Sequence, residues 1–89
     1  MSGHRILRFV GRNEHGKASS GARLGNPADL VEEFYVAGWR SLVVSRDDRV
    51  VGRVEPAMRP GGRSWWAVDD TAAAPDVTVG NAPAEAMAR

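Results

Sequence analysis

The chain of 89 residues has no cysteine, so it forms no disulfide bonds and offers no thiolate for catalysis or metal binding. It has no apolar run that approaches the roughly 18 residues of a membrane-spanning helix. Its first residues lack the apolar segment of a signal peptide. These absences predict a protein of a reducing compartment, with the cytoplasm as its location and no membrane partner.

The chain also has little net charge, since its basic and acidic side chains nearly balance at a formal net charge of +1. Residues 1–68 hold eleven basic and seven acidic side chains, whereas residues 69–89 hold one Arg and four acidic side chains. A basic body with an acidic tail is a weak indication of a polyanionic partner. The same balance is ordinary for solubility, and it lies far from the strongly basic composition typical of nucleic-acid-binding domains.

The length allows a single domain with a modest core. We expect this domain to span residues 1–69, and residues 70–89, which are rich in Ala and Pro, to form a flexible tail. Within the tail, Val77-Thr78-Val79 has the composition of a short edge strand. So short a chain has a small free energy of unfolding. Because dimerisation would add buried surface, a homodimer is an alternative to a monomer.

Residues 26–38 have the start, the periodicity and the end of a helix. Asn26 can cap the first turn through its side-chain oxygen, Pro27 suits the first helical position, and Gly38 suits a left-handed C-terminal residue. The apolar residues expected on the buried face follow a period of about 3.6 residues: Leu30, Val31, Phe34 and Ala37. We therefore predict a helix over about 27–38.

Four short segments predict strands, at residues 5–10, 42–44, 50–54 and 64–68. Arg46-Asp47-Asp48-Arg49 separates the second from the third. We expect a four-residue loop around a type I turn there, because Asp-Asp lacks the glycine that favours positive φ. Residues 11–25 contain four glycines and no apolar periodicity, so we expect them to form a long loop.

The elements follow the order strand, helix, strand, strand, strand. We predict an α+β fold in which the single helix packs on one face of a small, mainly antiparallel, four-stranded sheet. The last three strands should be antiparallel neighbours. The first strand can lie on either edge, and a right-handed crossover would make it parallel to its neighbour.

The stretch Gly11–Lys17 matches the pattern Gly-x-x-x-x-Gly-Lys of phosphate-binding loops and follows a predicted strand. Position 18, however, is Ala where a Ser or Thr would bind magnesium. No helix follows directly, so the helix N-terminus that contributes to phosphate binding is missing. We expect a Gly-rich loop rather than a nucleotide site, although its cations can still contact phosphate.

No other pattern predicts catalysis. His4 and His15 lie at no ligand spacing from a second His or Cys, and Asp47-Asp48 fits turn chemistry better than a carboxylate pair. We therefore expect no enzyme activity, no metal and no cofactor.

Trp65 and Trp66 are adjacent in the last predicted strand, so their side chains point to opposite faces of the sheet. We predict Trp66 in the core and Trp65 on the open face, together with Val43, Arg53 and an Arg of the first strand. An exposed Trp beside Arg can contact a protein or stack on a nucleic-acid base. The alternative is that the tail or a second subunit covers it.

The short, Arg-rich chain, with its motif Gly38-Trp39-Arg40-Ser41-Leu42-Val43-Val44, resembles in composition the small accessory proteins of actinobacteria and their phages. This resemblance implies a phage-encoded protein that binds and modulates a host component.

Two hypotheses of function follow. The first is a small non-enzymatic protein that binds a protein partner, or a second copy of itself, through the open face. Its predicted contact residues are Trp65, Arg53, Arg40 and Val43. The second is a nucleic-acid-binding module whose affinity falls steeply with salt. Its predicted phosphate contacts are Arg8, Arg12, Lys17 and Arg23.

Overall fold

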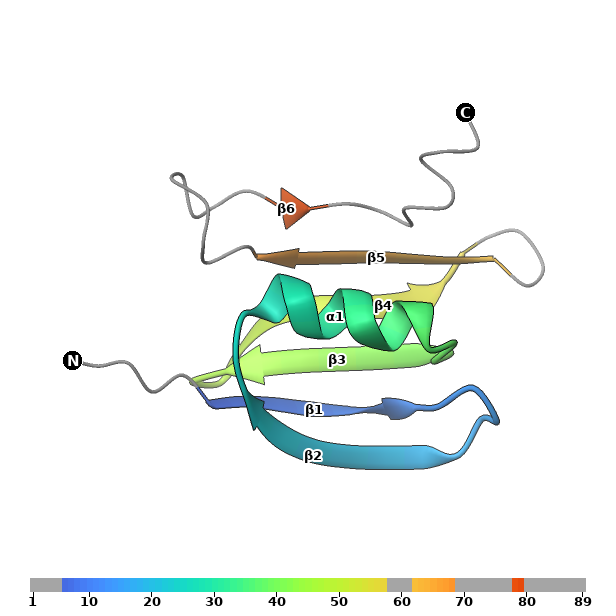
Figure 1. Ribbon diagram of the computed structural model, residues 1–89, viewed down its shortest axis with the longest axis horizontal. Coiled ribbons are helices and arrows are strands. Elements are labelled where there is room, and N and C mark those ends of the chain that lie inside the picture. Colours follow the sequence, from blue (N-terminus) through green and yellow to red (C-terminus); the bar gives the residue numbers. More distant parts are fainter. Residues whose placement is uncertain (1–5, 58–61, 69–77, 80–89) are drawn as a thin grey trace.

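The computed structural model describes residues 6–57, 62–68 and 78–79, in which one helix lies against one antiparallel sheet (Figure 1). The elements are β1 (Ile6–Arg12), β2 (Ala18–Leu24), α1 (Pro27–Val36), β3 (Ser41–Arg46), β4 (Arg49–Pro56), β5 (Arg63–Val68) and β6 (Thr78–Val79). Side by side, the strands have the order β2-β1-β3-β4-β5-β6. The predicted tail lies outside the described residues except for β6.

The α+β class, the single helix on one face and the antiparallel meander of β3, β4 and β5 are confirmed. The predicted number of four strands is wrong, because β2 and β6 bring the strands among the described residues to six. Of these two, β6 lies within Val77-Thr78-Val79, the segment that has the composition of a short edge strand. The expected edge position of the first strand is also wrong. β1 lies between β2 and β3 and is antiparallel to both, since β2 folds back along β1 and takes the edge position itself.

The strand β2 corrects the prediction of a long loop over residues 11–25. It pairs with β1 without interruption, from Arg12 opposite Ala18 to Ile6 opposite Leu24. As an edge strand it buries neither face, so no apolar alternation appears in its sequence. Backbone pairing holds it, and composition alone does not reveal such pairing.

The helix begins at Pro27, as the sequence predicts, and its capping residues are the predicted Asn26 and Gly38, but it ends two residues earlier than predicted. The side-chain oxygen of Asn26 accepts a hydrogen bond from the backbone N–H of Ala28 (3.0 Å). At the other end, Gly38 has φ 99° and its N–H donates to Tyr35 O, while Trp39 N–H donates to Phe34 O. These two bonds form a Schellman motif. The helix ends at Val36, and Ala37 is exposed rather than part of the buried face.

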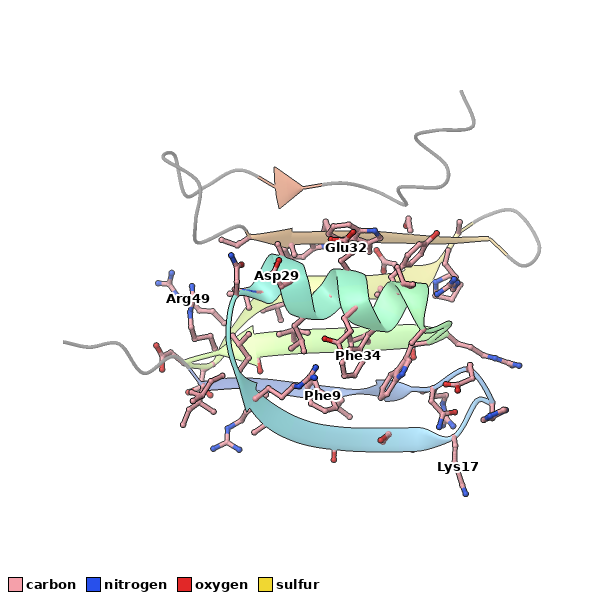
Figure 2. All side chains as sticks on the ribbon, viewed as in Figure 1. Phe9, Lys17, Asp29, Glu32, Phe34 and Arg49 are labelled. Atoms are coloured by element: carbon pink, nitrogen blue, oxygen red, sulfur yellow. The ribbon has the colours of Figure 1, made fainter. Side chains whose placement is uncertain are left out.

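The core lies between α1 and the sheet. Leu30, Val31 and Phe34 of the helix are buried there. They meet side chains from one face of the sheet: Leu7, Leu42, Val44, Val51, Val54, Trp65 and Ala67. Phe9 and Phe34 point toward one another between sheet and helix (Figure 2), with ring centroids 4.9 Å apart. Gly52 lets α1 approach closely, because a Cβ there would lie 2.5 Å from Val31 Cγ2.

The turn between β3 and β4 is tighter than the predicted four-residue loop. Arg46 pairs with Arg49, which leaves two turn residues, Asp47 (φ 52°) and Asp48 (φ 65°). Two positive φ values are typical of a type I′ turn, whose twist matches the twist of the strands. The prediction of a type I turn is therefore wrong. The twist of β3 and β4 favours positive φ at both turn residues, although Asp adopts positive φ less readily than Gly.

Candidate functional site

The sheet has one face that α1 does not cover, on the far side in Figure 1, and we call it the open face. Strand pairing aligns four of its residues in one transverse line. Val10 lies opposite Val43, Val43 opposite Arg53, and Arg53 opposite Trp66. We call these four residues the central row. The prediction that Val43 and Arg53 share the open face is confirmed.

Large apolar side chains gather on the open face. Among the described residues, five large hydrophobic side chains are exposed, and four of them lie here: Ile6, Val10, Leu24 and Val50. Their exposed fractions run from 49% to 67%. The fifth, Val36, is on the helix. Apolar side chains that are scattered singly need no explanation, whereas their concentration on one face is typical of an interaction surface.

Arginines lie among these apolar side chains. Arg8 and Arg12 lie two residues on either side of Val10, and Arg53 belongs to the central row. Arg8 and Arg53 form no hydrogen bond or ion pair with another described residue. Arg12 Nη1 donates to Gly16 O at 2.9 Å and keeps its other donors. Glu55 is the one acidic side chain of β4 here, so the described residues of the open face carry an excess of positive charge.

A shallow depression of about 350 Å³ lies at one end of the open face. Its lining combines apolar groups of the central row with side chains of both charges: Val10, Val43, Arg12, Arg53 and Glu55. Val43 and Arg53 were predicted to contact a protein partner, and Arg12 was predicted to contact nucleic-acid phosphate. The depression brings all three together.

The placement of the two tryptophans is the reverse of the prediction. Trp65 is 5% exposed, lies opposite the buried Val54 and packs near Tyr35. It belongs to the core and cannot contact a partner on the open face. Trp66, opposite Arg53, is only partly buried and takes that place. Alternation shows that the two rings face opposite ways, but only the register with β4 shows which one faces the helix.

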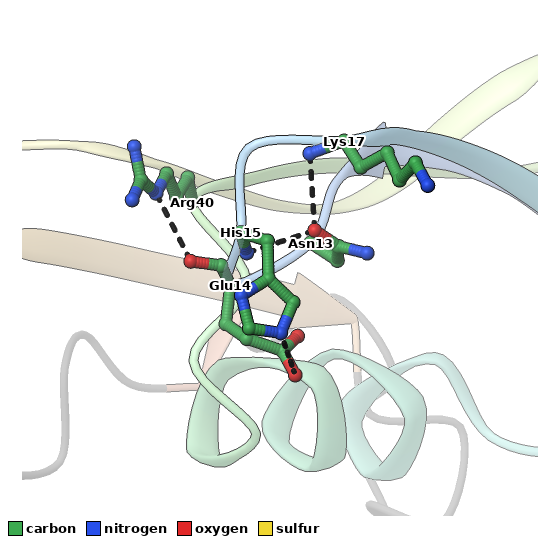
Figure 3. A network of polar contacts seen from close by, with 5 residues as sticks. All are labelled: Asn13, Glu14, His15, Lys17 and Arg40. Carbon is green, nitrogen blue, oxygen red and sulfur yellow. Dashed lines mark hydrogen bonds and ion pairs between the residues drawn. The ribbon is translucent and has the colours of Figure 1, made fainter.

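Arg40 does not lie on the open face. It follows the helix and packs against the turn between β1 and β2, where its Nε donates to Glu14 O at 3.3 Å (Figure 3). Its backbone N–H donates to Arg12 O. The prediction that Arg40 joins Trp65, Arg53 and Val43 in one contact surface is therefore wrong, because the start of β3 holds Arg40 beside the turn.

The stretch Gly11–Lys17 is the end of β1 and the turn into β2, and its backbone amides are used within the turn. Asn13 Oδ1 accepts from the N–H groups of His15 (2.8 Å) and Lys17 (3.0 Å), as Figure 3 shows. Gly16 N–H donates to Asn13 O, and Asn13 N–H to Lys17 O. A phosphate-binding loop needs such amides free to point at the ligand. Four backbone N–H groups of this turn already donate hydrogen bonds within the turn, so they are not free to bind phosphate.

The four predicted phosphate contacts do not form one cluster. Arg8 and Arg12 share the open face, whereas Arg23 lies on the helix side of β2, where it forms an ion pair with Glu33 (3.1 Å) and lies over the Phe34 ring. Lys17 lies at the end of the β1–β2 turn, directly before β2, and points away from the sheet (Figure 2). The structure therefore separates Arg23 and Lys17 from the pair on the open face.

Sequence reasoning assigned no role to Arg63, which supports the helix rather than the open face. Its Nη1 donates to the carbonyls of Tyr35 (2.9 Å) and Trp39 (2.8 Å), and its guanidinium lies 4.2 Å from the Tyr35 ring centroid. A cation at the C-terminal end of a helix satisfies carbonyls and the helix dipole. No local signal links Arg63 to a helix so distant in sequence.

The described ranges contain no cluster of three or more His, Cys, Asp or Glu side chains able to hold a metal ion. They also contain no helix with the length and apolar composition needed to cross a membrane.

Comparison with known proteins found no family model, no curated protein and no solved structure that matches the chain. The compositional resemblance to small accessory proteins of actinobacteria and their phages therefore stays a prediction.

Proposed function

We propose that this chain is a small non-enzymatic module that binds a protein partner through the open face. The observation that supports this proposal is the combination of an aliphatic surface with arginines that have few partners of their own. Ile6, Val10 and Leu24 offer apolar contact area. Arg8 and Arg53 offer bidentate donors to carboxylates. Aliphatic surface of this kind fits a protein better than a nucleic-acid base.

The charge of the open face indicates the chemistry of the partner. Arg8, Arg12 and Arg53 outnumber Glu55, so two copies packed face to face would bring arginines near arginines, and such like-charge contacts are unfavourable. A partner with an apolar patch bordered by carboxylates satisfies both the aliphatic centre and the arginines.

Matched substitutions on two surfaces test the proposal. Val10→Asp places a charge at the centre of the open face, and Val36→Asp places one on the exposed side of the helix, where Val36 is 74% exposed. Immobilised wild-type and variant proteins would be compared for capture of proteins from an actinobacterial lysate, a source chosen from the compositional resemblance. We expect Val10→Asp to lower capture of the specific partner by about tenfold or more, and Val36→Asp to leave it unchanged. Equal capture by the two variants would rule out the open face.

Nucleic-acid binding is the second candidate, and the register favours it in one respect. Trp66 lies directly opposite Arg53, and a partly exposed aromatic ring beside a cation can stack on an unpaired base. The test is sedimentation with a labelled single-stranded oligonucleotide and a labelled duplex at low and at physiological salt. This candidate predicts co-sedimentation that added salt abolishes, and a salt slope that falls by about one when Arg53 becomes Gln. Absence of co-sedimentation at low salt would eliminate it.

A further inference from the structure

The two edge strands of the sheet differ in length, and the longer one lacks the features that usually prevent an edge strand from pairing with another chain. The strand at one edge, β6, has two described residues, whereas β2 at the other has seven and pairs with β1 in unbroken register. A long edge strand is usually blunted by proline, a bulge or outward charge. β2 contains no proline, and its one charged side chain, Arg23, is turned to the helix side and paired with Glu33.

The free backbone groups of β2 can be assigned from two hydrogen bonds. Asn13 N–H donates to Lys17 O across the turn, and Arg40 N–H donates to Arg12 O on the other side of β1. Because antiparallel pairs alternate between bonded and non-bonded positions, the amides of Ser19, Gly21 and Arg23 face β1. The N–H and C=O groups that face away from the sheet belong to the alternate residues: Ala18, Ser20, Ala22 and Leu24.

The side chains of these alternate residues lie on the open face, and most of them are small. Ala22 lies opposite Arg8, Ser20 opposite Val10, and Ala18 opposite Arg12. A strand added beyond β2 would lie about 10 Å from β1, at two strand spacings. Only two alanines lie between such a strand and the two arginines, so an arginine and a carboxylate can meet over them.

We propose that β2 binds an extended segment of the partner protein as an additional antiparallel strand. The segment carries two carboxylates four residues apart, which pair with Arg8 and Arg12, and an apolar residue midway between them, which lies near Val10 and Ser20. This inference rests on the proposed function and specifies the chemistry of the partner. A second copy of the chain fits less well, because its β2 offers no carboxylate and would leave both arginines unpaired.

Selection from a display library of random peptides of about nine residues tests this binding mode. We expect the selected peptides to be enriched in Asp or Glu at two positions four apart. Ser20→Pro removes one outward N–H and keeps the bonds to β1, which an edge strand tolerates. It should weaken binding by about tenfold or more, and the matched Ser20→Ala should change it by less than about twofold. Hydrogen exchange at the Ser20 and Ala22 amides should slow by about tenfold or more in the complex.

A double reversal, Arg8→Glu with Arg12→Glu, supplies a test that leaves the backbone of β2 unchanged. It should shift the selection to peptides with Lys or Arg at the same two positions.

The other outcomes distinguish binding at the edge strand β2 from binding on the open face alone. Peptides that bind Ser20→Pro normally but lose binding to Val10→Asp would overturn the strand addition and retain the proposed function. Peptides that respond to neither variant would overturn both. Self-association of the wild-type chain that Ser20→Pro abolishes would assign β2 to a second copy and overturn the acidic-segment proposal.

Discussion

Along each strand, residues of the helix-covered face alternate with residues of the open face, so neighbouring residues allow the two faces to be compared. On β1, Leu7 is fully buried while Ile6 is 53% exposed. On β5, Trp65 is in the core while Trp66 is only partly covered. Within each pair the side chains are similarly apolar, so hydrophobicity does not separate the two faces. The helix separates them, because it can cover only one side of the sheet.

The open face departs from the usual pattern of a half-solvated antiparallel sheet, in which the uncovered side is polar. It carries aliphatic side chains that are about half exposed or more, together with arginines that form few contacts. Exposed side chains without a packing role are available for binding. The residues of the helix-covered face therefore hold the fold, and those of the open face are the ones that we expect to contact a partner.

The two adjacent tryptophans should show the largest contrast between the faces. Trp65→Ala removes a buried ring and should lower the free energy of unfolding by about 3–5 kcal/mol. Trp66→Ala should lower it by less than about 1 kcal/mol. Urea unfolding followed by circular dichroism measures both values, with Trp65→Phe as a milder core variant. Equal losses for the two alanine variants would contradict the assignment of the faces.

A valine on each face offers a second contrast at nearly constant volume. Val44 is fully buried and Val10 is 55% exposed. Val44→Thr buries a hydroxyl and should cost about 1–3 kcal/mol, whereas Val10→Thr should change stability by less than about 0.5 kcal/mol. Thermal unfolding of both variants checks this expectation. A Val10→Thr loss as large as that of Val44→Thr would mean that something covers the open face.

The N-terminal cap stabilises α1, and α1 is the element that covers one face of the sheet. Asn26→Ala removes the side-chain acceptor of the Ala28 N–H and should destabilise the protein by about 1 kcal/mol. Asn26→Ser retains an acceptor and should recover most of the loss. Chemical denaturation of the three proteins makes the comparison, and an unchanged midpoint for Asn26→Ala would show that the cap contributes nothing.

The smallest effect is expected at the β3–β4 turn, which belongs to neither face. Asp48→Gly relieves the left-handed backbone at φ 65°, a strain of roughly 1–2 kcal/mol for most residues. The greater freedom of Gly in the unfolded chain offsets roughly 0.4–1 kcal/mol of this gain. We therefore expect a net stabilisation of about 0.5 kcal/mol, visible as a raised melting temperature. A lowered melting temperature would show that the Asp48 side chain stabilises the turn.

Prediction from the sequence succeeded where the signal is local. The helix was found because Asn26 and Gly38 mark its ends and Leu30, Val31 and Phe34 repeat at helical spacing. The central strands were found from their β-branched runs. The strand β2 was missed because an edge strand of small residues buries nothing that would appear as a pattern.

The candidate surface was predicted only in part, for the same reason. Val43 and Arg53 were assigned correctly because they lie in neighbouring strands of a predictable hairpin. Trp65 and Arg40 were misassigned because their positions depend on contacts with segments distant in sequence, β4 and the β1–β2 turn. A period of two residues shows that neighbours face opposite ways and does not show which way is inward.

Local signals in the sequence specify the class of the fold, the capping residues of the helix and the alternation along each strand, because caps, periodicity and β-propensity act within a few residues. The tertiary structure alone decided the register between strands, the edge position of β2 and the side of the sheet that the helix covers. Those choices depend on long-range backbone pairing and on the burial of one face against α1. They also decide which of two chemically similar neighbours, such as Trp65 and Trp66, becomes core and which becomes surface.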